Sequence, residues 1–89
     1  GVITGTKKYL IRVRFTGKCA VYAKERQWQP DQVLIEDGDD TIVEFQTTHT
    51  LEVTRWVLSW GSCAKVEGDR EFAGIIKKEL VNMMGNYGD

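Results

Sequence analysis

The order in which strand-like and helix-like hydrophobic patterns follow one another is the strongest constraint on the fold of this chain. Residues 8–15, KYLIRVRF, place Tyr9, Ile11, Val13 and Phe15 on one face and Leu10, Arg12 and Arg14 on the other, in the manner of a half-buried strand. Residues 17–27, GKCAVYAKERQ, have helical spacing and follow Thr16, a residue type that caps helices. Residues 32–36 and 41–45 flank the turn sequence DGDD, which predicts a β-hairpin.

The second half of the chain continues with a helix and a short strand. Residues 48–61, THTLEVTRWVLSWG, carry a broad apolar stripe at helical spacing. Thr48 or Thr50 could cap the start of this helix, and Gly61 is placed to end it in a left-handed conformation. Residues 63–67, CAKVE, predict a strand that buries its two apolar side chains.

The last pattern is a helix over residues 70–84, which Asp69 is placed to cap and Gly85 to stop. The resulting order is strand, helix, strand, strand, helix, strand, helix. It predicts an α+β domain, namely a ferredoxin-like βαββαβ plait with a four-stranded antiparallel sheet and an added C-terminal helix. At 89 residues we expect one domain, residues 1–89, and the start at Gly1 suggests a piece cut from a longer chain.

The composition excludes several classes of protein. Twelve basic and 13 acidic residues are interleaved and give a formal charge of −1, so no basic arm is available for nucleic acid or anionic lipid. No apolar run has the length of a membrane span, and nothing resembles a signal peptide. We therefore expect a cytoplasmic protein without membrane contact.

The cysteines, Cys19 and Cys63, are far apart and have no CxxC companion. We expect two small buried thiols in a reducing cytoplasm, although a disulfide would help a domain of this size. Together with the single His49 they do not make a tetrahedral zinc set, so we expect no metal and no cofactor.

The sequence shows no catalytic constellation. His49 stands alone at a helix start, and there is no nucleophile elbow, carboxylate pair or phosphate-cradling glycine motif. The stretch FTGK points backbone amides and Lys18 at one spot, which is only a weak anion-site signal. We therefore expect that the chain is not an enzyme.

Trp28 lies in an unusual place for a large aromatic residue, two positions before Pro30, the only proline. Pro30 stops the preceding helix, so the indole could lie across the helix end with its ring nitrogen bonded to a carbonyl. The alternative is a ligand-stacking role on the surface. Arg26 and Arg55 each lie near a tryptophan and could stack on an indole or pair with an acid.

The two faces of the predicted sheet differ. Val33 and Ile35 are expected to face the helices together with the apolar residues of the other strands. The residues expected on the opposite, open face are Leu10, Arg12, Arg14, Leu34, Glu36, Ile42, Glu44 and Gln46. Because the first and third strands are neighbours in this fold, Arg12 and Arg14 should lie opposite Glu44 or Gln46. These four residues are either exposed cross-strand pairs or part of an interface or ligand site.

Two motifs give the chain a specific resemblance. The first is W-x-P-x-Q, formed by Trp28, Pro30 and Gln32, and the second is RWVLSWG, which contains Arg55, Trp56 and Gly61. In their order and spacing, residues 8–87 resemble the WCX domain, the C-terminal extension found after the WYL domain in bacterial helix-turn-helix transcriptional regulators. The resemblance implies that these six residues are structural motif positions.

The resemblance also implies a function. The domain would be a non-catalytic regulatory and dimerisation module that transmits effector state to a helix-turn-helix elsewhere in the parent chain. It implies a homodimer, the WYL domain of the same chain as a partner, an unidentified small effector, and no direct contact with duplex DNA. The alternative is a small-molecule sensor domain of ferredoxin-like fold, with its ligand near a helix N-terminus or on the open sheet face.

Overall fold

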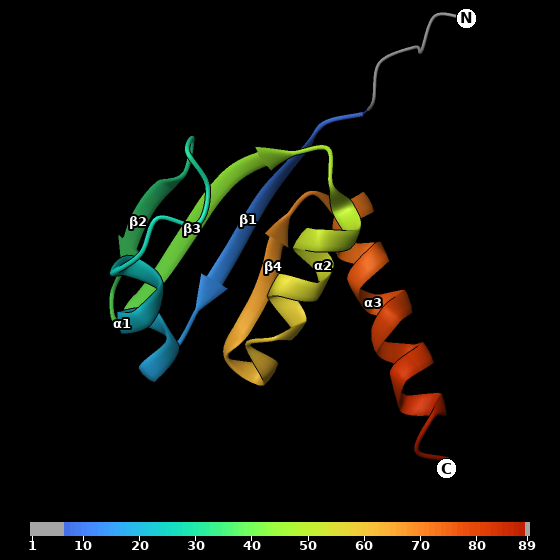
Figure 1. The fold of residues 1–89 in the computed structure, drawn as a ribbon. Helices are drawn as coiled ribbons and strands as arrows, with labels where there is room; N and C mark the ends of the chain where they lie inside the picture. Colours follow the sequence, from blue (N-terminus) through green and yellow to red (C-terminus); the bar gives the residue numbers. More distant parts are fainter. Residues whose placement is uncertain (1–6, 89) are drawn as a thin grey trace, which may run out of the picture.

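The computed structural model of the protein describes residues 7–88, which form an antiparallel sheet and helices that cover one of its faces (Figure 1). The strands are β1 (Tyr9–Phe15), β2 (Val33–Asp37), β3 (Asp40–Thr47) and β4 (Ala64–Gly68). The helices are α1 (Lys18–Lys24), α2 (Thr50–Leu58), the short 3₁₀ turn η1 (Gly61–Cys63) and α3 (Arg70–Gly85). The predicted α+β class, the four-stranded antiparallel sheet and the element order are thus confirmed.

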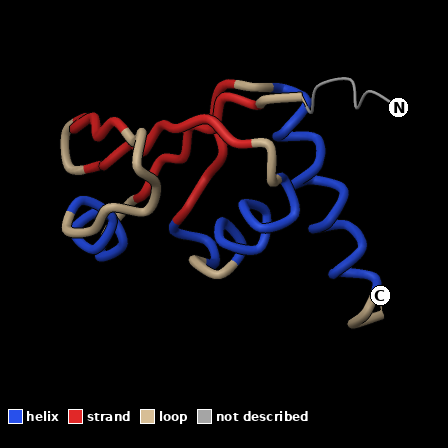
Figure 2. The backbone as a smooth tube through the Cα atoms, turned by 45° about the horizontal axis from the view of Figure 1, so that its top comes forward, coloured by secondary structure: helices blue, strands red, loops and turns tan. Residues whose placement is uncertain are grey.

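The sheet has the order β2-β3-β1-β4, so that the first strand of the chain lies at its centre. Seen along the sheet, α1 and α2 lie beneath it and α3 lies to one side, next to β4 (Figure 2). Ile11, Val13 and Phe15 of β1 are fully buried between the sheet and the helices, as their alternation predicts. Val43 and Phe45 of β3 join them in the same core.

Strand β2 faces the opposite way from the prediction. Leu34 pairs with Val43 and therefore lies on the helix side, whereas Ile35 pairs with Ile42 and lies on the open face with Val33. Glu36, also expected on the open face, instead lies 3.3 Å from Lys24 Nζ of α1. The physical reason is that the run Val-Leu-Ile has no alternation, and β2 is an edge strand whose residues are mostly exposed, so burial does not select its face.

The helix caps agree with the prediction only in part. Asp69 caps α3 as predicted, because its carboxylate accepts the backbone N–H groups of Glu71 and Phe72 at 2.8 and 3.0 Å. Thr16 does not cap α1, which begins after Gly17 with a φ of 58°, and neither Thr48 nor Thr50 caps α2, which begins after His49.

The end of α2 also differs from the prediction. Helix α2 ends at Leu58, so Gly61 does not terminate it but starts η1 in the left-handed region, with a φ of 66°. In α1 the buried residues are Ala20 and Ala23, while Val21 is exposed.

The cysteines differ from the prediction as well, because Cys19 and Cys63 form a disulfide with a Cα–Cα distance of 6.2 Å. The fold explains this pairing, since the backbone N–H of Thr16 donates to the carbonyl of Cys63 at 3.0 Å and the start of α1 therefore touches η1. A sequence separation of 44 residues gives no hint of that proximity. Among residues 7–88, no helix is long and apolar enough to cross a membrane.

Candidate functional site

The W-x-P-x-Q motif is a loop closed by the side chain of Gln32. Its Oε1 accepts the backbone N–H groups of Trp28 at 2.5 Å and Gln29 at 3.2 Å, and its Nε2 donates to the carbonyl of Arg26 at 3.0 Å. One side-chain amide thus bonds three backbone groups of the loop that follows α1. Pro30 lies at the tip of this loop, where it needs no N–H.

The Trp28 indole lies across the end of α1. Its Nε1 donates to the carbonyl of Ala23 at 3.1 Å, the contact expected of an anchor. The ring packs against Trp56 and Trp60 of the second motif, with ring centroids 5.6 and 5.4 Å away. The guanidinium of Arg26 lies 5.8 Å from the Trp28 ring centroid on the outer side.

The two sequence motifs therefore meet in one cluster of aromatic rings, the tryptophan cluster, formed by Trp28, Trp56, Trp60, Phe15 and Phe45. Phe15 packs edge-on against Trp56 and Trp60, with centroid distances of 5.8 and 5.0 Å. Edge-to-face pairs of this kind stabilise a core beyond the effect of the area they bury. The cluster connects the loop after α1 to α2 and to the centre of the sheet.

A small cavity of about 210 Å³ lies at the edge of this cluster, between the Trp28 loop and the start of α2. Its lining combines the aromatic residues Trp28, Phe45 and Trp56 with polar residues that include His49 and Glu52. Trp56 lines it, and the buried Nε1 of Trp56 has no hydrogen-bond partner among the residues the structure describes. A neighbouring polar cavity of about 290 Å³ is lined by Lys8, Asp31 and His49, among others.

The open face of the sheet carries a network of charges, the open-face network. Arg12 lies opposite Glu44 on β3, as predicted, and its guanidinium contacts Glu44 and also Glu67 on β4, the latter at 3.6 Å. Arg14 lies opposite Ile42 rather than an acid. Gln46 lies opposite Leu10, and its backbone N–H donates to Asp31 Oδ2 at 3.1 Å, so Gln46 does not belong to the network.

Arg14 is the most heavily engaged member of the open-face network. Its Nη1 lies 2.9 Å from both Asp37 and Asp40 at the hairpin turn, and its Nε lies 2.7 Å from Glu67. The bond to Glu67, followed by those to the two aspartates, raises the pKa of Arg14. The bond from Arg14 in turn lowers the pKa of Glu67. Sequence reasoning missed Glu67 and the two aspartates because the pairing register was not known.

A second ion cluster joins the start of β1 to the start of α3. Lys7 Nζ lies 2.6 Å from Glu71, and the Tyr9 hydroxyl donates to the same carboxylate. The bond from Lys7 lowers the pKa of Glu71, and the bond to Glu71 raises the pKa of Lys7 and of Tyr9. This cluster fixes the first turn of α3 against the sheet.

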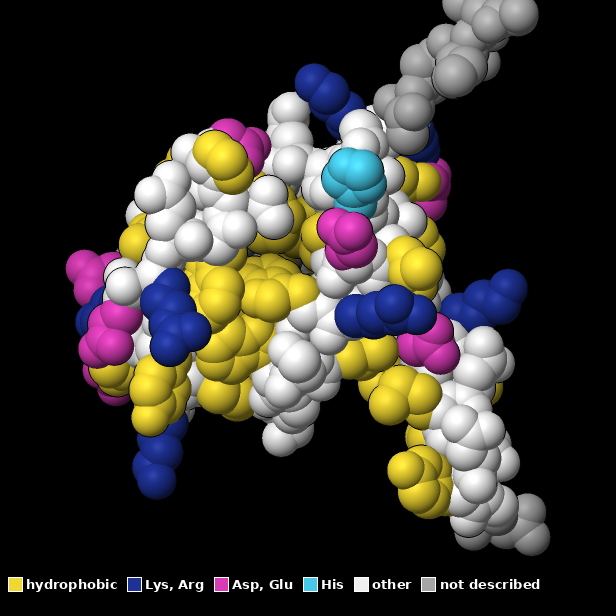
Figure 3. All heavy atoms as spheres, in the orientation of Figure 1, with side chains coloured by type: hydrophobic (Ala, Val, Ile, Leu, Met, Phe, Trp, Pro, Cys, Tyr) yellow, Lys and Arg dark blue, Asp and Glu magenta, His cyan; other side chains and the backbone are white. Residues whose placement is uncertain are grey.

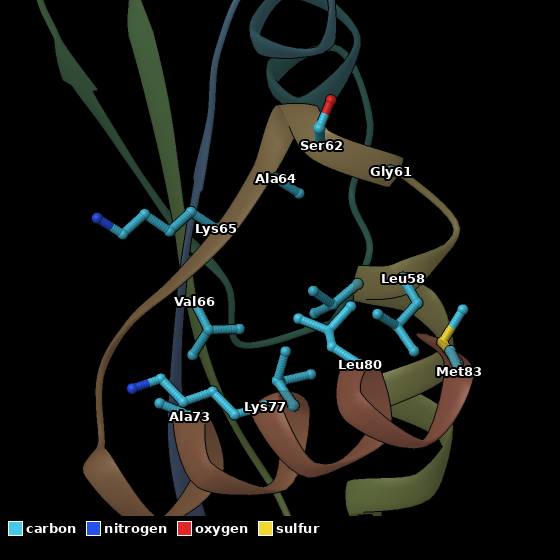
Figure 4. A pocket seen from close by; sticks show the side chains of 12 residues that line it. Leu58, Gly61, Ser62, Ala64, Lys65, Val66, Ala73, Lys77, Leu80 and Met83 are labelled. Atoms are coloured by element: carbon cyan, nitrogen blue, oxygen red, sulfur yellow. The ribbon is translucent and has the colours of Figure 1, made fainter. Parts of the chain in front are cut away.

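An apolar groove of about 590 Å³ lies between α2, η1, β4 and α3 (Figure 4). The residues that line this apolar groove are Val57, Leu58, Gly61, Ser62, Ala64, Lys65, Val66, Ala73, Ile76, Lys77, Leu80 and Met83. Leu80 lies near the middle of the lining residues, Leu58 and Met83 lie on one side, and the side chains of Lys65 and Lys77 extend to the other (Figure 4). Sequence reasoning did not predict this groove.

Arg55 and His49, the remaining residues that the sequence singled out, are both exposed. Arg55 is exposed on α2, without an ion pair among residues 7–88. His49 is exposed just before α2, and its backbone N–H donates to Thr47 Oγ1 at 2.9 Å. Within the described part of the chain, no three His, Cys, Asp or Glu residues are grouped so that they could hold a metal ion.

Comparison with known proteins identifies the family. The family model described as WCX domain matches residues 7–84, which is most of the chain and includes both tryptophan motifs, the central sheet and α3. No curated protein sequence matches the chain. The chain belongs to the WCX domain family.

Proposed function

We propose that this chain is a non-catalytic regulatory and assembly module of a bacterial transcriptional regulator, with a helix-turn-helix and a WYL domain elsewhere in the parent protein. Membership of the WCX domain family supports the regulatory role. We infer further that the sheet and its helices form a ferredoxin-like plait, which the order β2-β3-β1-β4 supports. The module would act in the cytoplasm and transmit the effector state of the regulator without touching DNA itself.

The observation that carries the assembly role is the apolar surface around the apolar groove. Soluble monomers seldom leave a large contiguous apolar surface in water, and such surfaces usually mark a protein contact. In this chain the groove is continuous with the exposed apolar residues at the end of α3, among them Leu80 and Met84. A partner that covers this surface would gain the free energy of burying it.

The open-face network supports a structural role for Arg12 and Arg14. Both guanidinium groups contact carboxylates of the same chain, as described above. A partner that used these arginines would first have to displace Glu44, Glu67 or the two aspartates. We therefore assign the network to holding the strands together, and assign the contact with partners to the apolar groove.

Such a module regulates by favouring one arrangement of the parent regulator over another. A contact that is present in only one of two arrangements shifts their populations by its differential free energy. An effector bound elsewhere could then act on the helix-turn-helix through the presence or absence of the groove contact. Catalysis by this domain has no part in the mechanism.

A second candidate function, a small-molecule sensor, is favoured by one specific observation. The cavity beside the tryptophan cluster is lined by aromatic side chains and a few polar residues, the usual composition of a ligand site. The unpartnered Nε1 of Trp56 would donate to an acceptor atom of such a ligand. Ligand binding there would be detected as a change of tryptophan fluorescence that the Trp56→Phe variant lacks.

The experiment for the assembly role compares the parent regulator with a version that lacks the segment corresponding to residues 7–84. We expect the truncated protein to associate more weakly and to lose effector-dependent DNA binding, measured by sedimentation and by titration of labelled operator DNA. Full effector response without the segment would overturn the proposal. So would submicromolar, sequence-dependent binding of duplex DNA by the isolated 89-residue chain at physiological salt.

A further inference from the structure

The disulfide between Cys19 and Cys63 joins two segments that the sheet already holds together. Phe15 at the end of β1 pairs with Ala64 at the start of β4, so the residues after Phe15 meet those before Ala64. The backbone N–H of Thr16 donates to the carbonyl of Cys63 at 3.0 Å, and the N–H of Cys19 donates to the carbonyl of Thr16 at 3.2 Å. None of these contacts needs a bond between the sulfur atoms, so the two thiols of a reduced chain remain neighbours.

The reduced form of Cys63 also fits its surroundings. Its Sγ lies 3.1 Å from the carbonyl oxygen of Trp60. A thiol is a weak hydrogen-bond donor, whereas a disulfide sulfur carries no hydrogen. Reduction therefore leaves two thiols, one of which has an acceptor already in place. Cys63 is thus accommodated both as a thiol and in the disulfide.

Both cysteines are within reach of a small reagent. Cys19 and Cys63 are half-buried, and the residues before them, Lys18 and Ser62, are exposed. Reactive cysteines usually have this partial exposure, whereas deeply buried cysteines are inert. Apolar side chains gather at the surface between α1 and the end of α2 (Figure 3). A small uncharged oxidant of the peroxide class approaches such a surface more readily than an anion, because it loses less hydration.

The disulfide ties the start of α1 to η1, which lies between two features of the domain. Trp60, immediately before η1, belongs to the tryptophan cluster, with its ring centroid 5.0 Å from that of Phe15. Gly61 and Ser62 of η1 line the apolar groove. Since η1 has only three residues, a bond to Cys63 restrains the whole of this short segment.

We infer that Cys19 and Cys63 form a reversible redox site, at which a peroxide fixes η1 to the start of α1 and a dithiol reductant releases it. The inference goes beyond the proposed function but rests on it for the compartment, because disulfides of cytosolic proteins are usually transient and redox-sensing. In the unstressed cell the pair is reduced and η1 has more freedom. Oxidation restrains one side of the apolar groove, so the parent regulator responds to an oxidant as well as to its effector.

The chemistry of the site is balanced by a peroxide and a dithiol. The thiolate of one cysteine attacks an oxygen of hydrogen peroxide, the O–O bond breaks, and hydroxide leaves a sulfenic acid behind. The sulfur of the second cysteine attacks the sulfenic sulfur, so that the S–S bond forms and the S–O bond breaks with loss of water. The two sulfurs lose two electrons, and the peroxide is reduced to two molecules of water. A thioredoxin-type dithiol reverses this by two thiol–disulfide exchanges and becomes a disulfide itself.

The first test is reversibility in the folded 89-residue chain. Hydrogen peroxide is expected to remove two hydrogen atoms from the mass of the reduced chain and to block alkylation of both cysteines. A thioredoxin-type dithiol is then expected to restore both thiols without denaturant. Cys63→Ser, which keeps a donor for the Trp60 carbonyl, and Cys19→Ser are expected to form no internal cross-link. Circular dichroism confirms that each variant is folded.

Two results of this test overturn the redox site. One is a folded chain in which peroxide leaves both thiols free for alkylation, or carries them to sulfinic acids without a disulfide. The other is a disulfide that the dithiol reduces only after the chain is unfolded in denaturant. In that case the bond is a permanent cross-link.

The second test measures the effect on η1 by amide hydrogen exchange. Oxidation is expected to slow exchange over residues 61–64 at least about threefold, because a local opening of η1 now has to carry α1 with it. Residues 70–85 of α3 are the internal reference and are expected to exchange equally in both states. Peroxide is expected to change nothing in Cys63→Ser. Equal exchange over residues 61–64 in the oxidised and reduced wild-type chains overturns the restraint of η1.

The parent regulator separates this inference from the proposed function. Peroxide is expected to shift the effector concentration for half-maximal binding of operator DNA in the wild-type regulator, but not in its Cys63→Ser variant. If both respond alike, the redox input is overturned, although the assembly function stands as long as removal of the segment abolishes the effector response. If removal of the segment changes nothing, the assembly function fails, and the reversible site is still decided by the peroxide and dithiol experiment on the isolated chain.

Discussion

The Oε1 atom of Gln32 lies 2.5 Å from the backbone nitrogen of Trp28, and this bond ties together the two ends of the loop after α1. The same side chain bonds Gln29 and Arg26, so that one amide group holds three points of the loop. The loop in turn sets the position of the Trp28 indole on the tryptophan cluster. The spacing of W-x-P-x-Q is thus explained by the hydrogen bonds of its last residue.

We expect Gln32→Ala to lower the free energy of unfolding by about 1–3 kcal/mol, because it leaves backbone groups at the end of α1 without partners. Gln32→Glu keeps an acceptor but loses the donor to Arg26, and its effect should be smaller. Urea denaturation followed by tryptophan fluorescence measures the free energy of unfolding of both variants. Gln46→Ala, which removes a side chain with no hydrogen bond among the described residues, is the control and should change little.

Trp28→Ala is expected to cost about 3–5 kcal/mol, the range for truncation of a large packed aromatic side chain. That is a large part of the total stability of a small domain. Trp28→Phe keeps an aromatic ring in the cluster but loses the bond to Ala23, and should cost less. Tyr22→Ala on the exposed side of α1 is the control. A Trp28→Ala variant that melts within about a degree of the parent would instead favour a ligand-stacking role.

The disulfide should stabilise the domain by restricting the unfolded chain. For cysteines separated by 44 residues, the loop-entropy relation gives about 4 kcal/mol, near the top of the usual range for single disulfides. We expect the doubly substituted variant Cys19→Ala/Cys63→Ala to lose about 2–4 kcal/mol in denaturant titrations. Reductant should destabilise the wild-type chain by a similar amount and leave the variant unaffected. In a reducing compartment the two cysteines would be thiols and the disulfide would contribute nothing.

Glu67 should make the stability depend on pH at the acid end. Its bond from Arg14 lowers the pKa of Glu67 in the folded chain, so its contribution is fully present above the unfolded value of about 4.3. The contribution is lost as the pH falls through the lowered folded pKa. The stability difference between wild type and Glu67→Gln should therefore shrink from pH 7 towards about pH 3.

The control for this titration is Glu52→Gln, because Glu52 is exposed and makes no ion pair among residues 7–88. Its difference from wild type should stay nearly flat over the same range. A stability difference between wild type and Glu67→Gln that does not change with pH would contradict the ion pair between Arg14 and Glu67.

The sequence predicts those parts of the fold in which a local pattern and its burial agree. Strand β1 is central and alternates apolar and charged residues from Ile11 to Phe15, so its buried face follows directly from the pattern. Asp69 caps α3 because its carboxylate has to reach only backbone N–H groups in the first turn of that helix. Strand β2 has no alternation, so its face was predicted wrongly. The predicted caps at Thr16 and Thr48 were wrong because α1 begins after Gly17 and α2 begins after His49.

The rest could not be predicted because it depends on segments far apart in the chain. The disulfide needs α1 and η1 side by side, and the contact between Arg14 and Asp37 needs the register of the sheet. The apolar groove depends on how far α3 extends past the core, whereas a helical stripe shows only which residues share a face. Trp28 was predicted only in part. Its position after a helix indicated that the indole would lie across the helix end, but not that it would pack against Trp56 and Trp60.

The central place of β1 also has a consequence for how the chain folds. Of the four strands of this sheet β1 is synthesised first, yet it pairs with β3 about 30 residues later and with β4 about 50 residues later. The sheet cannot be completed until β4 has left the ribosome, and closure of these long loops must precede most of the stabilising contacts. Folding should therefore be slower than that of a helical bundle of equal length, and the α1 loop with its Gln32 bonds is the segment that can form earliest.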